Sequence, residues 1–346
     1  MKKTKVFITG GTGFLGVHLA RRFLKASWEV TLYDIADLDA RDLMDKVKFI
    51  KGDVTNKSAL LKAMRGHDYV VHTAAALPIQ VEKDIIFHIN IEGTENTLSA
   101  ALKSKIKRMV FISSTSVYGV PKHLPETENS PLDPIGWYGI SKIEGERLCK
   151  EYMQKGLQVN IIRPKTFLGI ERLGVFALWF EAIYNSRRLY ILGKGNNKYQ
   201  LLAVTDVVEA IYKALVSKAH NEIFNVGAKQ YGTWKSDLGY VIKQSKSQAK
   251  ITGLPILMSQ FVLSILEVLN LSPIAAWHYK TMPVNSYVSI SKAEKLLNWH
   301  PKKSNKELFL ESYNWYKDHR SEIINKKGNT HRVNWNFKIL NLVSKL

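Results

Sequence analysis

The sequence predicts an α/β protein with a doubly wound parallel sheet and a smaller C-terminal domain. Short apolar runs alternate with helical patterns over the first half of the chain, which is typical of parallel strands joined by helices. The runs contain few polar residues, as expected for strands covered on both faces. A glycine-rich turn separates the first run from the first helical pattern. These three observations carry the prediction.

The individual elements follow from the positions of these patterns. We expect strands at residues 5–10, 29–34, 47–53, 68–74, 108–114 and 159–164, and helices at 14–27, 90–104 and 139–155. A first domain is therefore predicted over residues 1–165, and the chain returns to it around 199–228. Residues 166–320 are expected to form mainly a substrate domain, followed by a C-terminal tail over 321–346.

Composition and charge narrow the class of protein. With 346 residues, 45% of them hydrophobic, the chain can fill one large core or two packed ones. The formal net charge is +20, but the basic residues are scattered, which argues against nucleic-acid binding. The one cysteine, Cys149, excludes an intramolecular disulfide and a cysteine-based metal site. No signal peptide and no long apolar span are recognisable. We expect a cytoplasmic enzyme without a metal.

The turn TGGTGFLG places Gly10, Gly13 and Gly16 between the first strand and the first helix. Glycines here allow a tight turn, close approach of the backbone to a pyrophosphate and packing of the helix on the sheet. Free N–H groups at the start of the helix bind anionic phosphates. The motif predicts a dinucleotide-binding site.

The second strand ends in Asp34, where a carboxylate accepts hydrogen bonds from ribose hydroxyls and repels a 2′-phosphate. No arginine follows, because the next residues are Ile35 and Ala36. This pattern favours NAD over NADP, although a solvated carboxylate at a strand end is the alternative. Later strand ends are expected to line the same cofactor, at the adenine and along the pyrophosphate and ribose: Asp53, Val54, Ala74 and Ala75.

Tyr138 and Lys142 lie four residues apart at the start of a predicted helix, so their side chains share one face. Ser114 ends the fifth strand and is expected at the same crevice. Oxidation of a carbinol needs a group that exchanges the hydroxyl proton, but a free tyrosine titrates near 10. A lysine ammonium and a positive nicotinamide ring would favour the phenolate. The pair is either this proton relay or an ordinary pair on a helix surface.

Together, TGGTGFLG, Ser114, Tyr138-x-x-x-Lys142 and Arg163-Pro164 resemble the extended short-chain dehydrogenase/reductase family of NAD-dependent epimerases and dehydratases. The resemblance extends from residue 4 to about 320 and includes Asp206-Val-Val and SKAEKLLNWHP at 291–301. It implies a Rossmann domain, a homodimer and a catalytic set of Ser114, Tyr138 and Lys142. The implied NAD site includes Gly10, Gly13, Phe14, Leu15, Asp34, Asp53 and Val54, with Pro164 and Thr166 beside the nicotinamide.

The resemblance also limits the reaction. Dehydratases of this family follow the serine with an Asp-Glu pair, whereas Thr115 and Ser116 occupy those positions here. The preferred function is therefore 4-epimerisation of a nucleotide sugar. The alternative is a 3β-hydroxysteroid-dehydrogenase-like oxidoreductase that acts on a sterol or lipid-linked alcohol. A structural or RNA-associated protein of this fold is a third possibility, which the intact Ser–Tyr–Lys set disfavours.

Four residues are candidates for substrate contact: Thr115, Lys165, Arg172 and Tyr199. Tyr199, beside Lys198, falls near the position where sugar-nucleotide relatives carry a diphosphate-binding arginine. His278 falls at a second basic position, with Lys280 nearby. Lys165 either points toward an anionic group of the substrate or turns to solvent or a carbonyl group.

The segment 251–279 contains the apolar stretch LPILMSQFVLSILEVLNLSPIAAW, with Glu267 as its one charged residue. Its polar positions, Gln260, Ser264, Glu267 and Asn270, form a narrow stripe at helical spacing. We expect a helix that is either buried in the substrate domain or a dimer contact, or that touches a membrane or a lipid-like substrate. The tail 321–346, with five Lys/Arg and one acid, leaves the same choice between packing and membrane-surface binding.

Overall fold

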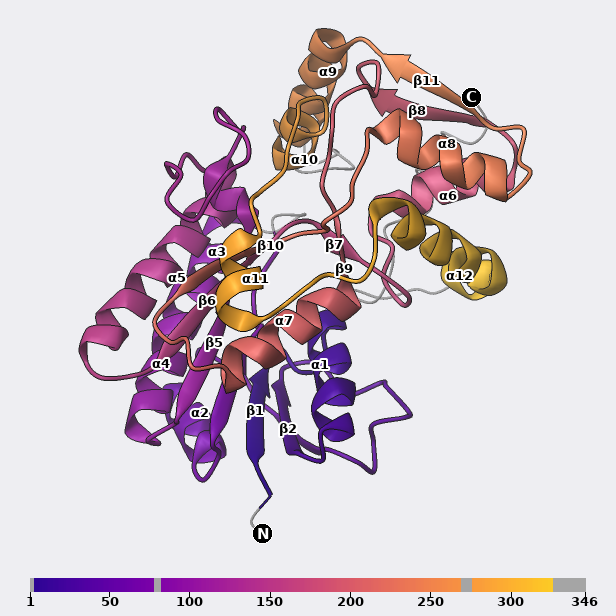
Figure 1. The fold of residues 1–346 in the computed structure, drawn as a ribbon. Coiled ribbons are helices and arrows are strands. Elements are labelled where there is room, and N and C mark those ends of the chain that lie inside the picture. The colour runs from indigo at the N-terminus through magenta and orange to yellow at the C-terminus, as the bar shows by residue number, and fades with distance from the viewer. Residues whose placement is uncertain (1–2, 78–81, 269–275, 326–346) are drawn as a thin grey trace.

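The computed structural model describes residues 3–77, 82–268 and 276–325. The N-terminal lobe is built on a seven-stranded sheet in the order β10-β6-β5-β4-β1-β2-β3 (Figure 1). Every neighbouring pair is parallel. The strands are β1 (Lys5–Thr9), β2 (Glu29–Asp34), β3 (Lys48–Lys51), β4 (Tyr69–His72), β5 (Arg108–Ile112), β6 (Val159–Pro164) and β10 (Ile223–Val226). This arrangement confirms the predicted doubly wound sheet.

Helices cover both faces of this sheet because successive strand residues point to opposite faces. In β1, Val6 and Ile8 pack with α1 and α7, whereas Phe7 packs with α2, α4 and α5. Figure 1 shows these two helical layers on either side of the strands. The bounds are α1 (Phe14–Lys25), α2 (Lys57–Met64), α4 (Gly93–Lys103), α5 (Gly136–Gln154) and α7 (Val204–Val216). Shorter helical segments are α3 (Lys83–Phe87), η1 (His88–Glu92), η2 (Thr115–Tyr118) and α11 (Ser291–Leu297).

The second lobe has its own core, in which Trp179, Phe180, Trp234 and Phe309 are buried. Its strands β8 (Arg188–Leu192) and β11 (Lys250–Leu254) pair in parallel, and β7 (Phe167–Leu168) pairs with β9 (Leu202–Ala203). Its helices are α6 (Phe176–Tyr184), α8 (Trp234–Gln244), α9 (Ile256–Val268), α10 (Ala276–Thr281) and α12 (Asn305–Asn325). The lobe lies at the opposite end of the molecule from the N-terminus (Figure 1).

Each predicted strand and helix is present, most of them with shifted ends, but the seventh strand of the sheet, β10, and most elements of the second lobe were not predicted individually. The expected helix at 90–104 begins as the π-helical turn η1, and α5 begins at Gly136, three residues before its expected start at 139. α2 has no counterpart among the predicted elements. Asn270 and most of the predicted tail lie outside the described residues. In the part of the chain that the structure describes, no helix combines the length and apolar character needed to cross a bilayer.

Candidate active site

A pocket of about 1490 Å³ opens at the carboxyl ends of the strands, between the two lobes. In a parallel sheet, this edge is where ligands bind. The second lobe contributes residues 172–176 and 276–278 to the pocket wall. Most of the predicted site residues line the pocket: Gly10, Gly13, Phe14, Leu15, Asp34, Asp53, Val54, Ala74, Ala75, Ser114, Tyr138, Lys142, Pro164, Lys165, Thr166 and Arg172.

The glycine turn has no side chain at Gly10 and Gly13, so a ligand in the pocket can approach its backbone closely. Gly10 has a φ of +66°, and a Cβ there would lie 2.6 Å from the backbone nitrogen of Ala74. Gly13 is the N-cap of α1. Gly16 does not line the pocket, since its Cα faces the turn and a Cβ would lie 2.4 Å from the Gly10 carbonyl oxygen. The role of Gly16 is therefore the packing of helix on turn, while the rest of the turn fits a pyrophosphate.

The carboxylate of Asp34 is held rigidly at the end of β2. Its two oxygens accept hydrogen bonds from the backbone nitrogens of Thr12, at 3.1 Å, and Ala36, at 3.0 Å. Asp53 lies at the next strand end, where its carboxylate accepts a hydrogen bond from the backbone nitrogen of Thr55 at 2.9 Å. Both carboxylates line the pocket, so the donor set fits the ribose and adenine of a dinucleotide.

The predicted catalytic set comes together at one point. Tyr138 lies in the first turn of α5, and the Ser114 side chain is near enough to its hydroxyl to lower the pKa of the phenol. Ser114 caps η2, where its Oγ accepts a hydrogen bond from the backbone nitrogen of Ser116 at 3.1 Å. The Nζ of Lys142 donates to the Ile112 carbonyl oxygen at 2.9 Å and lies 5.6 Å from the centre of the Tyr138 ring. The three side chains line one pocket, as the predicted proton relay requires.

The pKa of Tyr138 differs from the expectation. Burial raises it to about 12, against the opposing effects of the Arg172 charge and the Ser114 hydrogen bond. Burial also lowers the pKa of Lys142 to about 8. The Arg172 charge favours the phenolate of Tyr138, and the Lys142 Nζ donates to the Ile112 carbonyl oxygen.

Arg172 lies on the loop before α6. Its guanidinium group is 5.6 Å from the centre of the Phe14 ring, at the start of α1. Burial lowers the pKa of Arg172, and the Tyr138 side chain opposes that effect. Arg172 therefore links the glycine turn to Tyr138, a position that the sequence pattern alone did not reveal.

The remaining substrate candidates lie deeper. Lys165 is buried; its Nζ donates to Ser286 Oγ at 2.7 Å and lies 4.9 Å from the centre of the Tyr199 ring. Tyr199 is stacked on Trp234, with ring centres 4.3 Å apart, and does not line the pocket. Thr115 is also buried outside the main pocket, in a small neighbouring cavity. Of the three predicted substrate contacts, Lys165 thus lies at the pocket wall, whereas Tyr199 and Thr115 are buried outside the main pocket.

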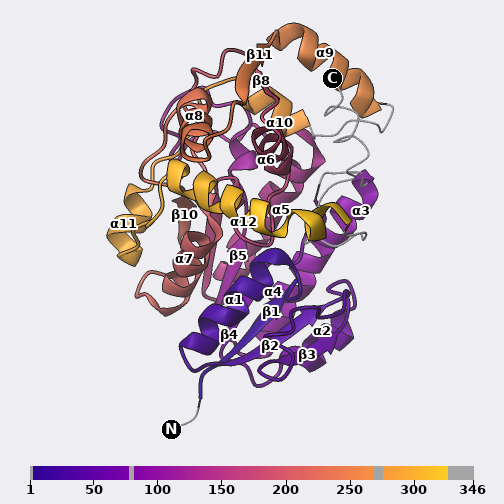
Figure 2. The ribbon, with the colours of Figure 1, turned by 90° about the vertical axis from the view of Figure 1, so that its right-hand side faces the viewer.

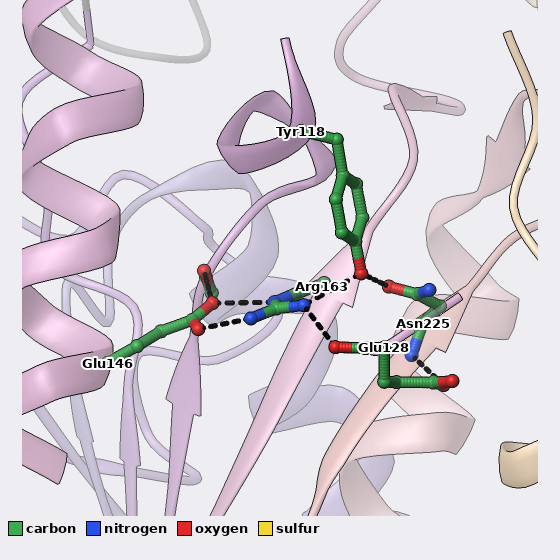
Figure 3. Close-up of polar contacts among 6 residues, drawn as sticks. Tyr118, Glu128, Glu146, Arg163 and Asn225 are labelled. Carbon is green, nitrogen blue, oxygen red and sulfur yellow. Dashed lines mark hydrogen bonds and ion pairs between the residues drawn. The ribbon is translucent and has the colours of Figure 1, made fainter. Parts of the chain in front are cut away.

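A buried network behind the catalytic set was missed by the sequence patterns (Figure 3). Arg163 donates to both carboxylate oxygens of Glu146, at 2.8 and 2.5 Å, and to the Tyr118 hydroxyl at 2.7 Å. Tyr118 in turn donates to the side-chain oxygen of Asn225 at 2.7 Å. The signal for Glu146 was available, because it lies four residues after Lys142 and one helical turn along the same face. The network ties α5, β6, η2 and β10 together.

Known proteins resemble this chain over most of its length. The sequence model of the family described as NAD dependent epimerase/dehydratase matches residues 6–227. The protein y4nG of Sinorhizobium fredii is 33% identical over 94% of this chain and 82% of its own length. The N-acetyl-α-D-glucosaminyl-diphospho-ditrans,octacis-undecaprenol 4-epimerase of Escherichia coli O157:H7 is 31% identical over 64% of this chain and 66% of its own.

Solved structures show the same fold. The UDP-glucose 4-epimerase of Thermotoga maritima, crystallised with UDP-glucose, superimposes with a TM-score of 0.77 at 22% identity. The match covers 92% of this chain and 100% of that one. With the family match and the geometry of the pocket, this places the chain in the NAD-dependent epimerase/dehydratase family, of the extended short-chain dehydrogenase/reductase type.

Proposed function

We propose that the protein is a 4-epimerase that acts on a sugar linked to a diphosphate, most simply a nucleotide sugar. The observation that carries this proposal is that Tyr138, Ser114 and Lys142 line one pocket, which runs to the glycine turn at Gly10 and Gly13. A relative with 31% identity is itself a sugar 4-epimerase. Thr115 and Ser116 replace the acids that a dehydratase would need, which leaves epimerisation as the simpler chemistry.

The cofactor site follows from the pocket wall. The turn at Gly10 and Gly13, with Phe14 and Leu15 at the start of α1, would hold the pyrophosphate. Asp34 would accept the ribose hydroxyls. The adenine would lie against Asp53 and Val54, the pyrophosphate and ribose would pass Ala74 and Ala75, and the nicotinamide would lie beside Pro164 and Thr166. When bound, NAD supplies a reversible hydride acceptor.

The protein's own residues handle the proton. Tyr138 takes the proton from the sugar hydroxyl at C4 and later returns one to the oxygen of the ketone. Ser114 holds that oxygen, since its hydroxyl already meets the phenol. Lys142 would bind the nicotinamide ribose from the same face of α5, and the positive charge of Arg172 favours the phenolate. Lys165, at the pocket wall, favours an anionic substrate group.

The proposal divides the work between the two parts of the chain. Residues 1–165, with the return at 199–228, hold NAD, and residues 166–320 mainly hold the substrate.

We place the enzyme in the cytoplasm and propose that it is a homodimer, as the family resemblance implies. Light scattering coupled to gel filtration tests the dimer, and a monomeric mass would contradict it.

The experiment that tests the function follows the substrate and the cofactor together. The purified protein is incubated with UDP-glucose and with UDP-N-acetylglucosamine, and the C4 epimer is measured by NMR while NADH absorbance is recorded. We expect epimer without net NADH, and a kcat reduced by about 10²–10⁴ in Tyr138→Phe. Tyr152→Phe, on the same helix, is the matched control. Accumulation of NADH in step with substrate loss would contradict epimerisation and favour a dehydrogenase.

A second candidate is an epimerase or oxidoreductase for a lipid-linked alcohol, used at a membrane surface. The specific observation in its favour is α9, whose large apolar side chains are exposed. α9 contacts α10, and α10 contributes Ala276, Trp277 and His278 to the pocket wall. Activity on a polyprenyl-diphosphate sugar, with none on the nucleotide sugars, would select this candidate.

A further inference from the structure

Helix α9 exposes an apolar face. The side chains of Leu257, Met258, Phe261, Val262 and Ile265 are 84%, 62%, 66%, 49% and 44% exposed. Their spacing along the chain puts them on one side of an α-helix. Scattered apolar residues on a surface need no explanation, but a contiguous group of this kind marks an interaction site. We call these five residues the α9 face.

The orientation of α9 is fixed by contacts on its other side. The side chain of Gln260 donates to the Tyr279 carbonyl oxygen of α10 at 3.1 Å. Leu263, and Leu254 just before the helix, pack against the core of the second lobe. Turning the apolar face inward would break the Gln260 hydrogen bond and expose Leu263. The helix therefore directs Gln260 toward the protein and its large apolar side chains toward the solvent, the reverse of an ordinary amphipathic surface helix.

The helix lies at the extremity of the second lobe. Figures 1 and 2 show α9 at the end of the molecule farthest from the N-terminus, with α10 directly beneath it. Because α10 also forms part of the pocket wall, a surface that bound α9 would lie close to the pocket. A membrane or partner bound to α9 would therefore hold the opening of the pocket near its own surface.

The segments of the second lobe that include α9 and α10 are rich in basic residues. Residues 187–198 and 232–282 together contain nine Lys or Arg and two acids. One of those acids, Asp237, is buried and accepts hydrogen bonds from the Gly232 backbone and the Asn305 side chain. Lys194 and Lys280 are exposed, next to residues in contact with α9: Gly193 lies against the Ile256 side chain, and Tyr279 receives the Gln260 hydrogen bond.

We propose that the α9 face, flanked by Lys194 and Lys280, docks the enzyme on an anionic lipid bilayer. A helix with large apolar side chains on one face and cations at its edge settles at the headgroup–acyl boundary, and anionic lipids attract the cations. A second copy of the chain fits less well, because two surfaces of the same positive charge would meet. The inference names the membrane partner of the proposed enzyme, but the docking itself does not require the epimerase reaction.

The test is flotation of the full-length protein with vesicles of phosphatidylcholine alone or of phosphatidylcholine mixed with phosphatidylglycerol. We expect flotation with the anionic vesicles and a loss of about tenfold or more in Leu257→Gln/Phe261→Gln, since each side chain withdraws substantial apolar area from water. Lys194→Gln/Lys280→Gln should weaken binding and its dependence on salt. Met44→Gln and Lys62→Gln are matched controls, because both residues are exposed and lie in the other lobe.

A labelling experiment reports insertion directly. Cys149 is the only native cysteine and is buried, so Met258→Cys and Met44→Cys each offer one accessible thiol for an environment-sensitive fluorophore. We expect a blue shift on anionic vesicles for the first and none for the second.

Equal shifts, equal binding to neutral and anionic vesicles, or an α9 double variant that floats as well as the native protein would overturn the inference. So would a change of oligomeric state in that variant without any vesicle binding. All of these readouts are independent of turnover, so failure of docking and failure of the proposed function are separable.

Discussion

Glu146 and Arg163 form a buried two-point ion pair beside the candidate catalytic residues Ser114 and Lys142. Both side chains are 2% exposed, and the two hydrogen bonds between them measure 2.8 and 2.5 Å. Ser113, the neighbour of Ser114, donates to the same carboxylate at 2.5 Å. Glu146 also opposes the loss of the Lys142 charge on burial. The pair therefore holds the end of β5, the middle of α5 and β6 in one arrangement.

Breaking this pair should destabilise the protein strongly. Glu146→Gln leaves the Arg163 guanidinium buried without its counter-charge, which costs about 3–5 kcal/mol in the free energy of unfolding. The matched control is Glu151→Gln on the same helix, since Glu151 is exposed and pairs with exposed Arg147; its cost should be about 1 kcal/mol or less. Urea unfolding of the three proteins measures both values. Similar losses in the two variants would show that the buried pair has no special role.

How much the sequence could predict depends on the range of the interactions. The glycine turn, Asp34, Ser114, Tyr138 and Lys142 are local patterns at strand ends and on one helix face, so they were found with their approximate places. The position of Tyr199 outside the pocket could not be predicted, because it follows from stacking on Trp234, a contact between distant segments. The same is true of Arg172, whose effect on Tyr138 depends on a loop folding over the pocket.

The end of β2 should determine the cofactor preference. Asp34→Ser removes the carboxylate that would accept the ribose hydroxyls and repel a 2′-phosphate. We expect NAD to bind about tenfold or more weakly, because a hydrogen bond to a charged group is lost, and NADP to bind more tightly than to the native protein. Calorimetric titration with both dinucleotides measures the change. Asp45→Ser is the control at an exposed position, and an unchanged preference in Asp34→Ser would refute the assignment.

The charge of Arg172 should be visible in the pH dependence of the rate. Its positive charge lowers the pKa of Tyr138 relative to the effect of burial alone. Arg172→Gln should therefore raise the pKa of the phenol and move the ascending limb of the pH profile of kcat/KM to higher pH. Arg172→Lys keeps a positive charge, so its ascending limb should lie between those of Arg172→Gln and the native protein. A limb that does not move in Arg172→Gln, or moves to lower pH, would exclude this role.

Lys165 should make stability depend on pH on the alkaline side. Burial lowers its pKa in the folded protein from 10.5 to about 7, against the opposing charge of Glu126. Between these two values the unfolded chain binds more protons than the folded one, so the free energy of unfolding contributed by Lys165 rises with pH. Lys142, whose pKa is lowered to about 8, contributes in the same direction over a narrower range.

Removing the Lys165 amine should flatten that rise. We expect Lys165→Met to lose a contribution on the order of a few kcal/mol between neutral pH and pH about 10, and to be more stable than the native protein at neutral pH wherever the methionine packs as well. The control is Lys198→Met, because Lys198 is exposed and precedes Tyr199, which forms a β-bridge with Ser286, the residue that Lys165 contacts. It should keep the native slope. Chemical unfolding of the three proteins across this range measures the slopes. Parallel curves for Lys165→Met and the native protein would mean that the Lys165 amine stays protonated in the fold, held by Ser286 and the nearby Glu126 charge.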